Sequence, residues 1–353
     1  MSYSKFCVTI SAALQFFVFL VFGPVYAETK TQPLRIGFIA PLSGAAQVYG
    51  VAAKNGFELG LEDFGREWAE VLYEDDQFSP QKTVAAFHKL VHSDRVDALI
   101  CIGSTPCNSI AAISQKNGVP LFAWASDSKV ASGRPMVVRT YPDGRSEGTR
   151  VAEEASRLGI HQGALITATN DYSASWRDGF ATAFATGKIL LDEEVPSDLL
   201  DFRSLALKAS RLNTKHFAIC LNPGQSAAFA KQMRIFASEA VFFGCESLAD
   251  AGEVAMASGA LDEAWFATIP VNGEFRARYI TKFGNDSVIS GAAIHYELAR
   301  IFKKLSGNTP EKLISQMQSM TWPQESVMGK YSVAALAGDT YFDIQLRIER
   351  AKR

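Results

Sequence analysis

The sequence predicts an α/β protein made of two doubly wound parallel-sheet lobes, joined by a hinge that the chain crosses three times. Apolar runs of strand length alternate with segments of helical spacing from Leu34 to Ala125, which is typical of a parallel sheet covered on both faces. The same alternation resumes after 137–145 and continues to Ile269. A chain of 353 residues, 48% of them hydrophobic, also favours two domains over one.

The first residues predict a cleaved signal peptide at 1–27. Lys5 precedes an apolar segment from Phe6 to Phe22, and small residues then stand where a signal peptidase cuts. Polar residues interrupt the apolar segment, which argues against the alternative of an uncleaved membrane anchor. We therefore expect the chain from Glu28 onward to be exported to the periplasm.

The elements of the first half follow in order from their patterns. Strands are expected at 34–40, 71–74, 98–102 and 119–125, with helices at 47–64 and 81–92 and a third beginning after Gly103. Two strands of this kind are parallel neighbours only through a crossover helix, so their following loops share one edge of the sheet. The loops 43–49, 75–78, 103–106 and 125–128 should therefore meet at one edge, which makes that edge a candidate ligand site.

The second half repeats this plan after a link at 137–145. Helices are expected at 146–158, 172–186, 202–212 and 225–237, with a short one near 248–257, and strands at 163–168, 189–195, 216–221, 241–244 and 264–269. Helices at 274–283, 289–305 and 310–320 and strands at 329–333 and 341–349 complete the chain. We assign 34–143 and 272–325 to lobe 1, and 144–271 and 326–353 to lobe 2. The second lobe then presents loops 169–173, 222–224 and 245–247 to the cleft.

The turn from Gly103 to Pro106 carries the first candidate contact residues. A helix begins there with Ser104 or Thr105 as its cap and with Pro106 in the first turn, where a missing N–H costs nothing. Free N–H groups at such an end attract an anion, and the hydroxyl of Ser104 adds a donor. The turn is thus either a simple helix cap or a carboxylate-binding corner, and it does not decide between them.

Several residues could suggest a metal or cofactor site, but a simpler interpretation is favoured for each of them. Asp75 and Asp76 are expected to shape the turn before Ser79, and His88 and His92 lack the acid that a zinc-protease pattern requires. Cys220 and Cys245 end strands that should be neighbours, so a disulfide and two free buried thiols both remain open. We expect no metal and no cofactor.

The sequence argues against a nucleic-acid-binding protein and against an enzyme, so a protein that binds a small molecule is the function class that remains. A formal charge of −2 with no basic stripe gives no support for a nucleic-acid partner. The chain has no GxSxG motif, no Cys/His pair with an orienting acid and no phosphate loop, so we expect no enzymatic activity.

At this point the motifs resemble one family, the leucine-isoleucine-valine (branched-chain amino acid) type of periplasmic solute-binding protein, with the type I periplasmic binding fold. The residues that carry the resemblance lie in that family's order over nearly the whole mature chain: Ile36-Gly37, Pro41-Leu42-Ser43-Gly44, Tyr49-Gly50, Tyr73-Glu74-Asp75-Asp76, Ser79-Pro80-Gln81-Lys82, Gly103-Ser104-Thr105, Gly118-Val119-Pro120, Asn170-Asp171-Tyr172 and Phe243-Gly244-Cys245-Glu246.

The resemblance implies a ligand site. Ser104 and backbone N–H groups of the loop from Ala125 to Ser128 would hold the carboxylate of an amino acid, while the same loop and Glu246 would hold its ammonium. Tyr49 would line the side-chain pocket and Tyr172 would close over the ligand. The candidate contact residues are Tyr49, Ser104, Thr105, Ala125, Ser126, Ser128, Tyr172 and Glu246. From its place after a strand, Glu246 could equally be an exposed loop acid.

Three features depart from the family pattern and leave the identity of the solute open. Trp124 replaces a smaller residue before the first-lobe loop, Asp127 puts an acid near the expected carboxylate, and Asn222-Pro223-Gly224 replaces an aromatic-rich stretch.

The expected function is that of a periplasmic component of an ABC transporter that presents a bound amino acid or related carboxylate to a membrane permease, as a monomer. The alternatives are a ligand-sensing subunit that signals to a receptor or regulator and an exported hydrolase, which would require a nucleophile in the cleft.

Overall fold

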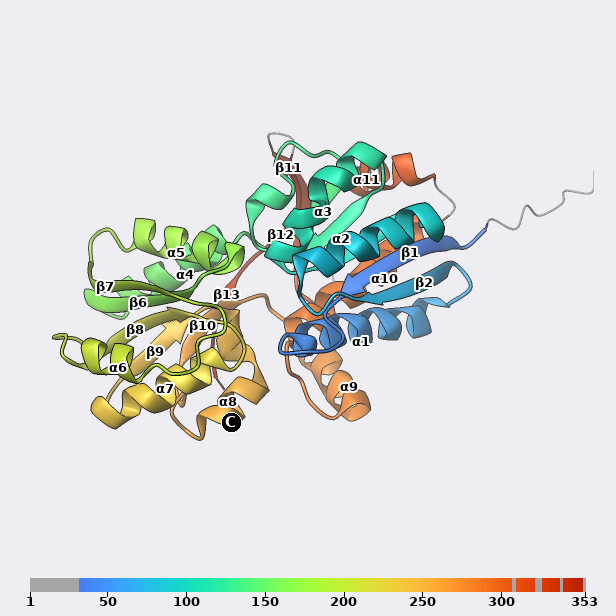
Figure 1. The fold of residues 1–353 in the computed structure, drawn as a ribbon. Coiled ribbons are helices and arrows are strands. Elements are labelled where there is room, and N and C mark those ends of the chain that lie inside the picture. Colours follow the sequence, from blue (N-terminus) through green and yellow to red (C-terminus); the bar gives the residue numbers. More distant parts are fainter. Residues whose placement is uncertain (1–31, 307–308, 321–325, 337–338, 352–353) are drawn as a thin grey trace, which may run out of the picture. The chain divides into compact units, whose positions relative to one another are not determined.

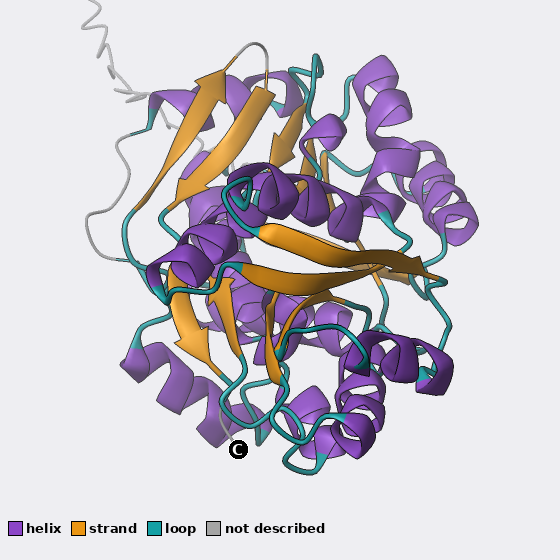
Figure 2. Ribbon diagram, turned by 90° about the vertical axis from the view of Figure 1, so that its left-hand side faces the viewer, coloured by secondary structure: helices purple, strands orange, loops and turns teal. Residues whose placement is uncertain are grey.

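The computed structural model describes residues 32–306, 309–320, 326–336 and 339–351, which belong to one compact unit. The expected signal peptide at 1–27 lies outside the described residues. The described strands form a seven-stranded and a six-stranded sheet, each with helices on both faces (Figures 1 and 2). We call these two sheets with their helices lobe 1 and lobe 2.

The first lobe is built on a sheet with the strand order β11-β12-β5-β4-β3-β1-β2. Its strands are β1 (Leu34–Ala40), β2 (Ala69–Asp75), β3 (Ala98–Ile102), β4 (Leu121–Trp124), β5 (Val137–Arg139), β11 (Tyr331–Leu336) and β12 (Asp339–Ile344). Its helices are α1 (Gln47–Phe64), α2 (Pro80–His88), α3 (Ser104–Asn117), α9 (Gly273–Phe283), α10 (Ile289–Leu305) and α11 (Pro310–Ser319). The strands from β1 to β5 are parallel, as the strand and helix alternation predicted.

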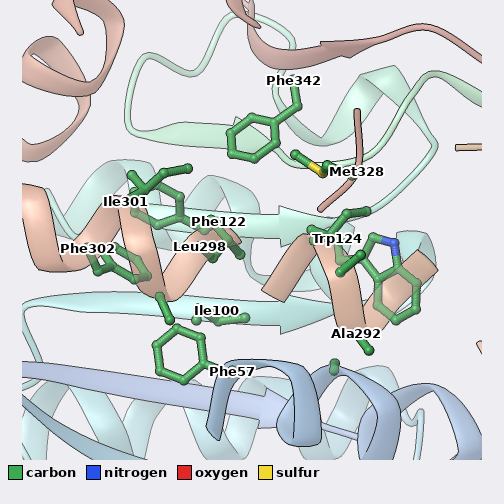
Figure 3. Close-up of a cluster of buried hydrophobic side chains, with 14 of the residues drawn as sticks. Phe57, Ile100, Phe122, Trp124, Ala292, Leu298, Ile301, Phe302, Met328 and Phe342 are labelled. Carbon is green, nitrogen blue, oxygen red and sulfur yellow. The ribbon is translucent and has the colours of Figure 1, made fainter. Parts of the chain in front are cut away.

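Alternate residues of these strands serve two separate cores, because successive side chains of a strand point to opposite faces. Phe38 and Ile100 pack with residues of α1 and α10, whereas Ile39 and Leu99 pack with residues of α2 and α3. Figure 3 shows the first of these cores, with Phe57 and Phe302 facing Ile100 and Phe122. The sequences of these strands are therefore continuous apolar runs.

The two central helices α1 and α10 approach each other closely at Gly56. A Cβ atom built there would lie 2.0 Å from the carbonyl oxygen of Ala292, so any larger residue would push the helices apart. This contact holds α10, which comes late in the chain, against the first-lobe sheet.

The second lobe repeats the arrangement with the strand order β13-β10-β9-β8-β6-β7. Its strands are β6 (Gln162–Ala168), β7 (Lys188–Val195), β8 (His216–Cys220), β9 (Val241–Gly244), β10 (Trp265–Thr268) and β13 (Arg347–Arg350). Its helices are α4 (Gly144–Arg157), α5 (Asp171–Ala183), α6 (Arg203–Ser210), α7 (Gln225–Phe236) and α8 (Ala251–Ala257). One face of this sheet packs on α4 and α5 and the other on α6 and α7.

Two details of the expected organisation were wrong. The link at 137–145 begins with a strand, β5, which is only three residues long and is stabilised by pairing with β4 and β12. The stretch 326–353 does not lie wholly with lobe 2, because β11 and β12 extend the first sheet and only β13 pairs antiparallel with β10. Edge pairing of short strands depends on which partner lies nearby, which local patterns do not contain.

The chain passes between the sheets at 140–143, at 269–272 and at 345–346. The expected number of three crossings is confirmed, whereas the third lies after β12 and not at the expected boundary between 325 and 326. Among the described helices, none combines the length and the apolar character that crossing a bilayer requires.

Candidate ligand-binding site

A cavity of about 360 Å³ is lined by residues of both lobes. Its walls come from the loops that follow the strands, as the right-handed crossovers predicted. The lining residues of lobe 1 and the segment after it are Ala45, Ala46, Tyr49, Gln77, Phe78, Ile102, Gly103, Ser104, Thr105, Trp124, Ala125, Ser126 and Tyr141. Those of lobe 2 are Asn170, Tyr172, Ser197, Leu221, Asn222, Pro223, Glu246 and Ser247.

The structure brings most of the predicted contact residues together in this cavity. Tyr49, Ser104, Thr105, Ala125, Ser126, Tyr172 and Glu246 all line it. Ser128 does not belong to its lining; it begins a short 3₁₀ helix (Ser128–Val130).

The start of α3 differs from the simple cap that we considered. The helix begins at Ser104 itself, and the capping position belongs to Gly103, whose φ of 94° suits glycine. Neither Ser104 nor Thr105 caps the helix through its side chain. Their N–H groups stand at the first two helical positions, where the helix offers no carbonyl to accept them. The anion-attracting end of α3 is therefore part of the cavity wall.

The hydroxyl of Ser104 is held by the neighbouring loop. The backbone N–H groups of Ser126 and Asp127 both donate to its oxygen, each over 3.1 Å. A hydroxyl oxygen has two lone pairs and one proton, so these contacts occupy the acceptor positions and leave the proton to be donated. The loop N–H groups that the resemblance assigned to a ligand thus act here through Ser104.

The acid that seemed out of place near this corner, Asp127, does not line the cavity. Its carboxylate accepts hydrogen bonds from the N–H of Lys129 over 3.0 Å and from the side-chain amide of Asn108 over 2.8 Å. The same amide nitrogen lies 3.2 Å from a carboxylate oxygen of Asp171 in the second lobe. Asp127 therefore belongs to a contact between the lobes.

Glu246 lies in the cavity wall with its carboxylate held by hydroxyl groups. Tyr141 donates to its Oε2, and Thr268 donates to its Oε1 over 3.0 Å. Burial raises the pKa of Glu246 above its ordinary value, and the hydrogen bonds from these hydroxyls oppose that rise. The exposed-loop alternative for this residue is wrong, since Glu246 is 9% exposed.

A second buried carboxyl group, Glu147 on α4, stands behind Glu246. It accepts hydrogen bonds from the backbone N–H of Glu246 over 3.0 Å and from the hydroxyl of Tyr172 over 2.9 Å. Burial, followed by the neighbouring Cys245 and Glu246, raises the pKa of Glu147 well above its ordinary value. Tyr172 thus presents its ring to the cavity while its hydroxyl is bound within lobe 2.

Aromatic side chains make up much of the wall. Tyr49, Phe78, Trp124, Tyr141 and Tyr172 all line the cavity. Trp124 lies 6.0 Å from the ring of Tyr49 and 6.3 Å from that of Tyr141, measured between ring centroids. The role of Tyr141 escaped the sequence analysis, where it fell in a linking segment. The sequence signal that could have identified Tyr141 is an aromatic residue in a segment where the chain crosses between the lobes.

The turn-shaping role expected for Asp75 and Asp76 is confirmed. Asp75 accepts hydrogen bonds from Leu42 and Ser43, and Asp76 from Phe78 and Thr83, so both acids shape strand-end turns. The four cysteines of the described part, Cys101, Cys107, Cys220 and Cys245, are buried and free. The described residues contain no group of three acidic, histidine or cysteine side chains that could hold a metal ion.

Comparisons with known proteins agree with this architecture. A family model described as a periplasmic binding protein matches residues 33–340, whereas no curated protein matches the chain. Among solved structures, a solute-binding protein of an ABC transporter from R. palustris in complex with benzoate is 18% identical with a TM-score of 0.81, covering 91% of this chain and 93% of its own.

Two amino-acid-binding proteins are similar to the same degree. A leucine-binding protein from Thermotoga maritima is 20% identical with a TM-score of 0.77, over 90% of this chain and 99% of its own. A branched-chain amino acid transporter substrate-binding protein from Streptococcus pneumoniae, in complex with isoleucine, is 18% identical with a TM-score of 0.79, over 90% and 99%. The chain therefore belongs to the periplasmic binding protein family, and its two-lobed type I fold is that of the leucine-isoleucine-valine type.

Proposed function

We propose that this chain is the periplasmic solute-binding component of an ABC transporter, which captures an amino acid or a related small carboxylate between its lobes and delivers it to a membrane permease. The observation that supports this proposal is the cavity of about 360 Å³ whose wall is shared by both lobes. A ligand that contacts both lobes favours their closed arrangement, because only differential affinity shifts a conformational balance.

The carboxylate would bind at the start of α3. Ser104 donates its proton to a carboxylate oxygen, and the first-turn N–H groups of Ser104 and Thr105 add donors at the positive end of the helix dipole. The backbone N–H groups of Ser126 and Asp127 hold the Ser104 hydroxyl in place. A negative ligand suits this corner, since Glu246 is the one Asp or Glu side chain among the residues that line the cavity.

The remaining contacts would come from Tyr49 and from the second lobe. Tyr49 and Tyr172 supply apolar ring surface, and Glu246 accepts a hydrogen bond from a donor group of the ligand, which is the ammonium in the case of an amino acid. The protein would act as a monomer without turning over its ligand. Residues 1–27 would be removed as a signal peptide during export.

The test is a ligand screen on the mature protein. Thermal-shift measurements against amino acids, amides, aromatic acids and small aliphatic carboxylates, followed by calorimetry, should find one-site binding of at least one carboxylate. Ser104→Ala should weaken that binding, and Ser109→Ala should not, because Ser109 lies on the same helix but donates to the carbonyl of Pro106 over 2.6 Å. Absence of binding by any carboxylate would overturn the proposal.

Uptake of the labelled ligand by cells separates transport from sensing. A strain that lacks this protein should lose uptake and regain it on complementation with the wild type. Unchanged uptake, together with a lost transcriptional or receptor response to the ligand, would support the sensing alternative in place of transport.

A further inference from the structure

The indole of Trp124 packs directly against a glycine of α10. A Cβ atom built at Gly291 would lie 2.3 Å from Cη2 of Trp124 and within 3 Å of two further ring atoms, so only glycine leaves room for the ring. Glycine costs about 1 kcal/mol relative to alanine inside a helix. Gly291 is not in a left-handed conformation, so its role here is the space that it leaves for Trp124.

Further rings fix the indole from its other sides. His295, one helical turn after Gly291, lies 5.4 Å from Trp124 at an interplanar angle of 76°. Tyr49 and Tyr141 approach it at 59° and 63°. The contacts with His295 and Tyr141 are edge-to-face, which aromatic pairs prefer, and the contact with Tyr49 is tilted. Figure 3 shows the indole beside α10 near Ala292, at the border of the first-lobe core. Trp124 therefore presents a rigid ring surface to the cavity rather than a mobile side chain.

The cavity offers little compensation for a positive charge. Glu246 is the one Asp, Glu, Lys, Arg or His side chain among the lining residues, and both of its carboxylate oxygens already accept hydrogen bonds from Tyr141 and Thr268. Burial raises the pKa of Glu246, because desolvation disfavours its charged form. A buried ammonium is unfavourable unless a carboxylate is available to pair with it.

We propose that Trp124, held by Gly291, determines the specificity of the cavity, and that the ligand is a carboxylate bearing a flat aromatic ring and no α-ammonium group. This rests on the proposed function, because the carboxylate is taken to bind at Ser104. The aromatic ring of the ligand lies against Trp124. Glu246 does not bind an ammonium group, as first expected, but accepts the hydrogen bonds of Tyr141 and Thr268. The branched aliphatic amino acids then bind weakly.

The experiment compares ligands that differ in one feature. Calorimetry of the mature protein is performed with L-leucine and 4-methylpentanoate, which share an aliphatic skeleton, and with L-phenylalanine and 3-phenylpropanoate, which share an aromatic one. Benzoate is added as the shortest ring carboxylate. We expect benzoate or 3-phenylpropanoate to bind at least about tenfold more tightly than 4-methylpentanoate and than L-phenylalanine.

Two substitutions then test whether Trp124 causes the preference. Trp124→Leu should lose about tenfold in affinity for the ring carboxylate while 4-methylpentanoate changes little. Trp124→Phe keeps a ring at the site and should retain the preference. The ring carboxylate should quench tryptophan fluorescence of the wild type but not of Trp124→Phe, since the other described tryptophans, Trp68, Trp176 and Trp265, do not line the cavity.

Each outcome has a distinct meaning. L-leucine binding as tightly as the ring carboxylates, or an unchanged ring preference in Trp124→Leu, would overturn this inference and leave the proposed function intact. A panel in which no compound binds, at concentrations up to about 10 mM, would overturn both. Thermal unfolding of each variant identifies any that fails to fold, in which case Trp124→Phe and its fluorescence decide.

Discussion

Tyr141 joins the two lobes through Glu246. The phenol of Tyr141, in the segment between β5 and α4, donates a hydrogen bond to Oε2 of Glu246, which follows β9. Both residues line the cavity, so the same contact holds the lobes together and shapes the ligand site. Burial raises the pKa of both groups.

Removing this phenol should loosen the lobes. Tyr141→Phe keeps the ring and deletes the donor, so we expect a loss of about 1–2 kcal/mol in the free energy of unfolding and a weaker ligand affinity. Urea denaturation and calorimetry measure the two effects. Tyr279→Phe is the matched control, because the Tyr279 hydroxyl accepts a hydrogen bond from the side-chain amide of Asn55, over 3.4 Å, within lobe 1. Equal effects of the two substitutions would argue against a special role for Tyr141.

Ser104→Ala should affect both stability and binding. It removes the acceptor of two backbone N–H groups and the donor for the carboxylate. We expect a loss of about 1–3 kcal/mol in ligand binding free energy, typical of an unmade hydrogen bond to a buried charged group. Calorimetry at constant pH measures this loss, with Ser109→Ala as the control. An unchanged affinity would reduce Ser104 to a support of its loop.

His295 should make stability depend on pH. It is fully buried, its Nδ1 lies 2.7 Å from the carbonyl oxygen of Gly291, and burial lowers its pKa from 6.5 to about 4. Between these values the unfolded chain binds more protons than the folded protein, so the free energy of unfolding rises with pH. The contribution amounts to about 3 kcal/mol and is lost as the pH falls from 6.5 toward 4.

The variant His295→Phe isolates this effect. Its free energy of unfolding should fall less steeply than that of the wild type between pH 6.5 and 4. Buried carboxyl groups such as Glu147 and Glu246 are common to both proteins, so their opposite dependence cancels in the difference. Parallel curves for the two proteins would show that folding does not lower the pKa of His295.

The contact between Gly291 and Trp124 predicts a coupled pair of substitutions. Gly291→Ala should destabilise the wild type by about 1–3 kcal/mol, because the added methyl group overlaps the indole. In the Trp124→Leu background the same change should cost less, or even stabilise the helix. Urea denaturation of the four proteins gives the coupling energy. Gly273→Ala is the control, since a Cβ atom there has nothing within 4 Å. Equal costs in both backgrounds would contradict the contact.

The local patterns were sufficient for the order of the main elements. The helices α1 and α10 and the strands β1, β3 and β9 begin and end where the apolar spacing predicted. These segments are buried on defined faces, so their hydrophobic periodicity records the structure directly. The convergence of the strand-end loops at one edge of each sheet followed from the fixed hand of the crossovers. That Ser104 and Glu246, which belong to different sheets, would share one site was implied by the family resemblance, and both line the cavity.

The tertiary structure alone decided the features that depend on distant neighbours. β5, β11 and β12 form one edge of the first sheet because each finds a partner there, and nothing within a three-residue strand such as Val137–Arg139 specifies that partner. Trp124 packs against Gly291, which lies 167 residues later in the sequence. This contact forms only when α10 packs on the first-lobe sheet. Sequence periodicity reports which side of a segment is buried; contacts between segments arise from the packing of the whole chain.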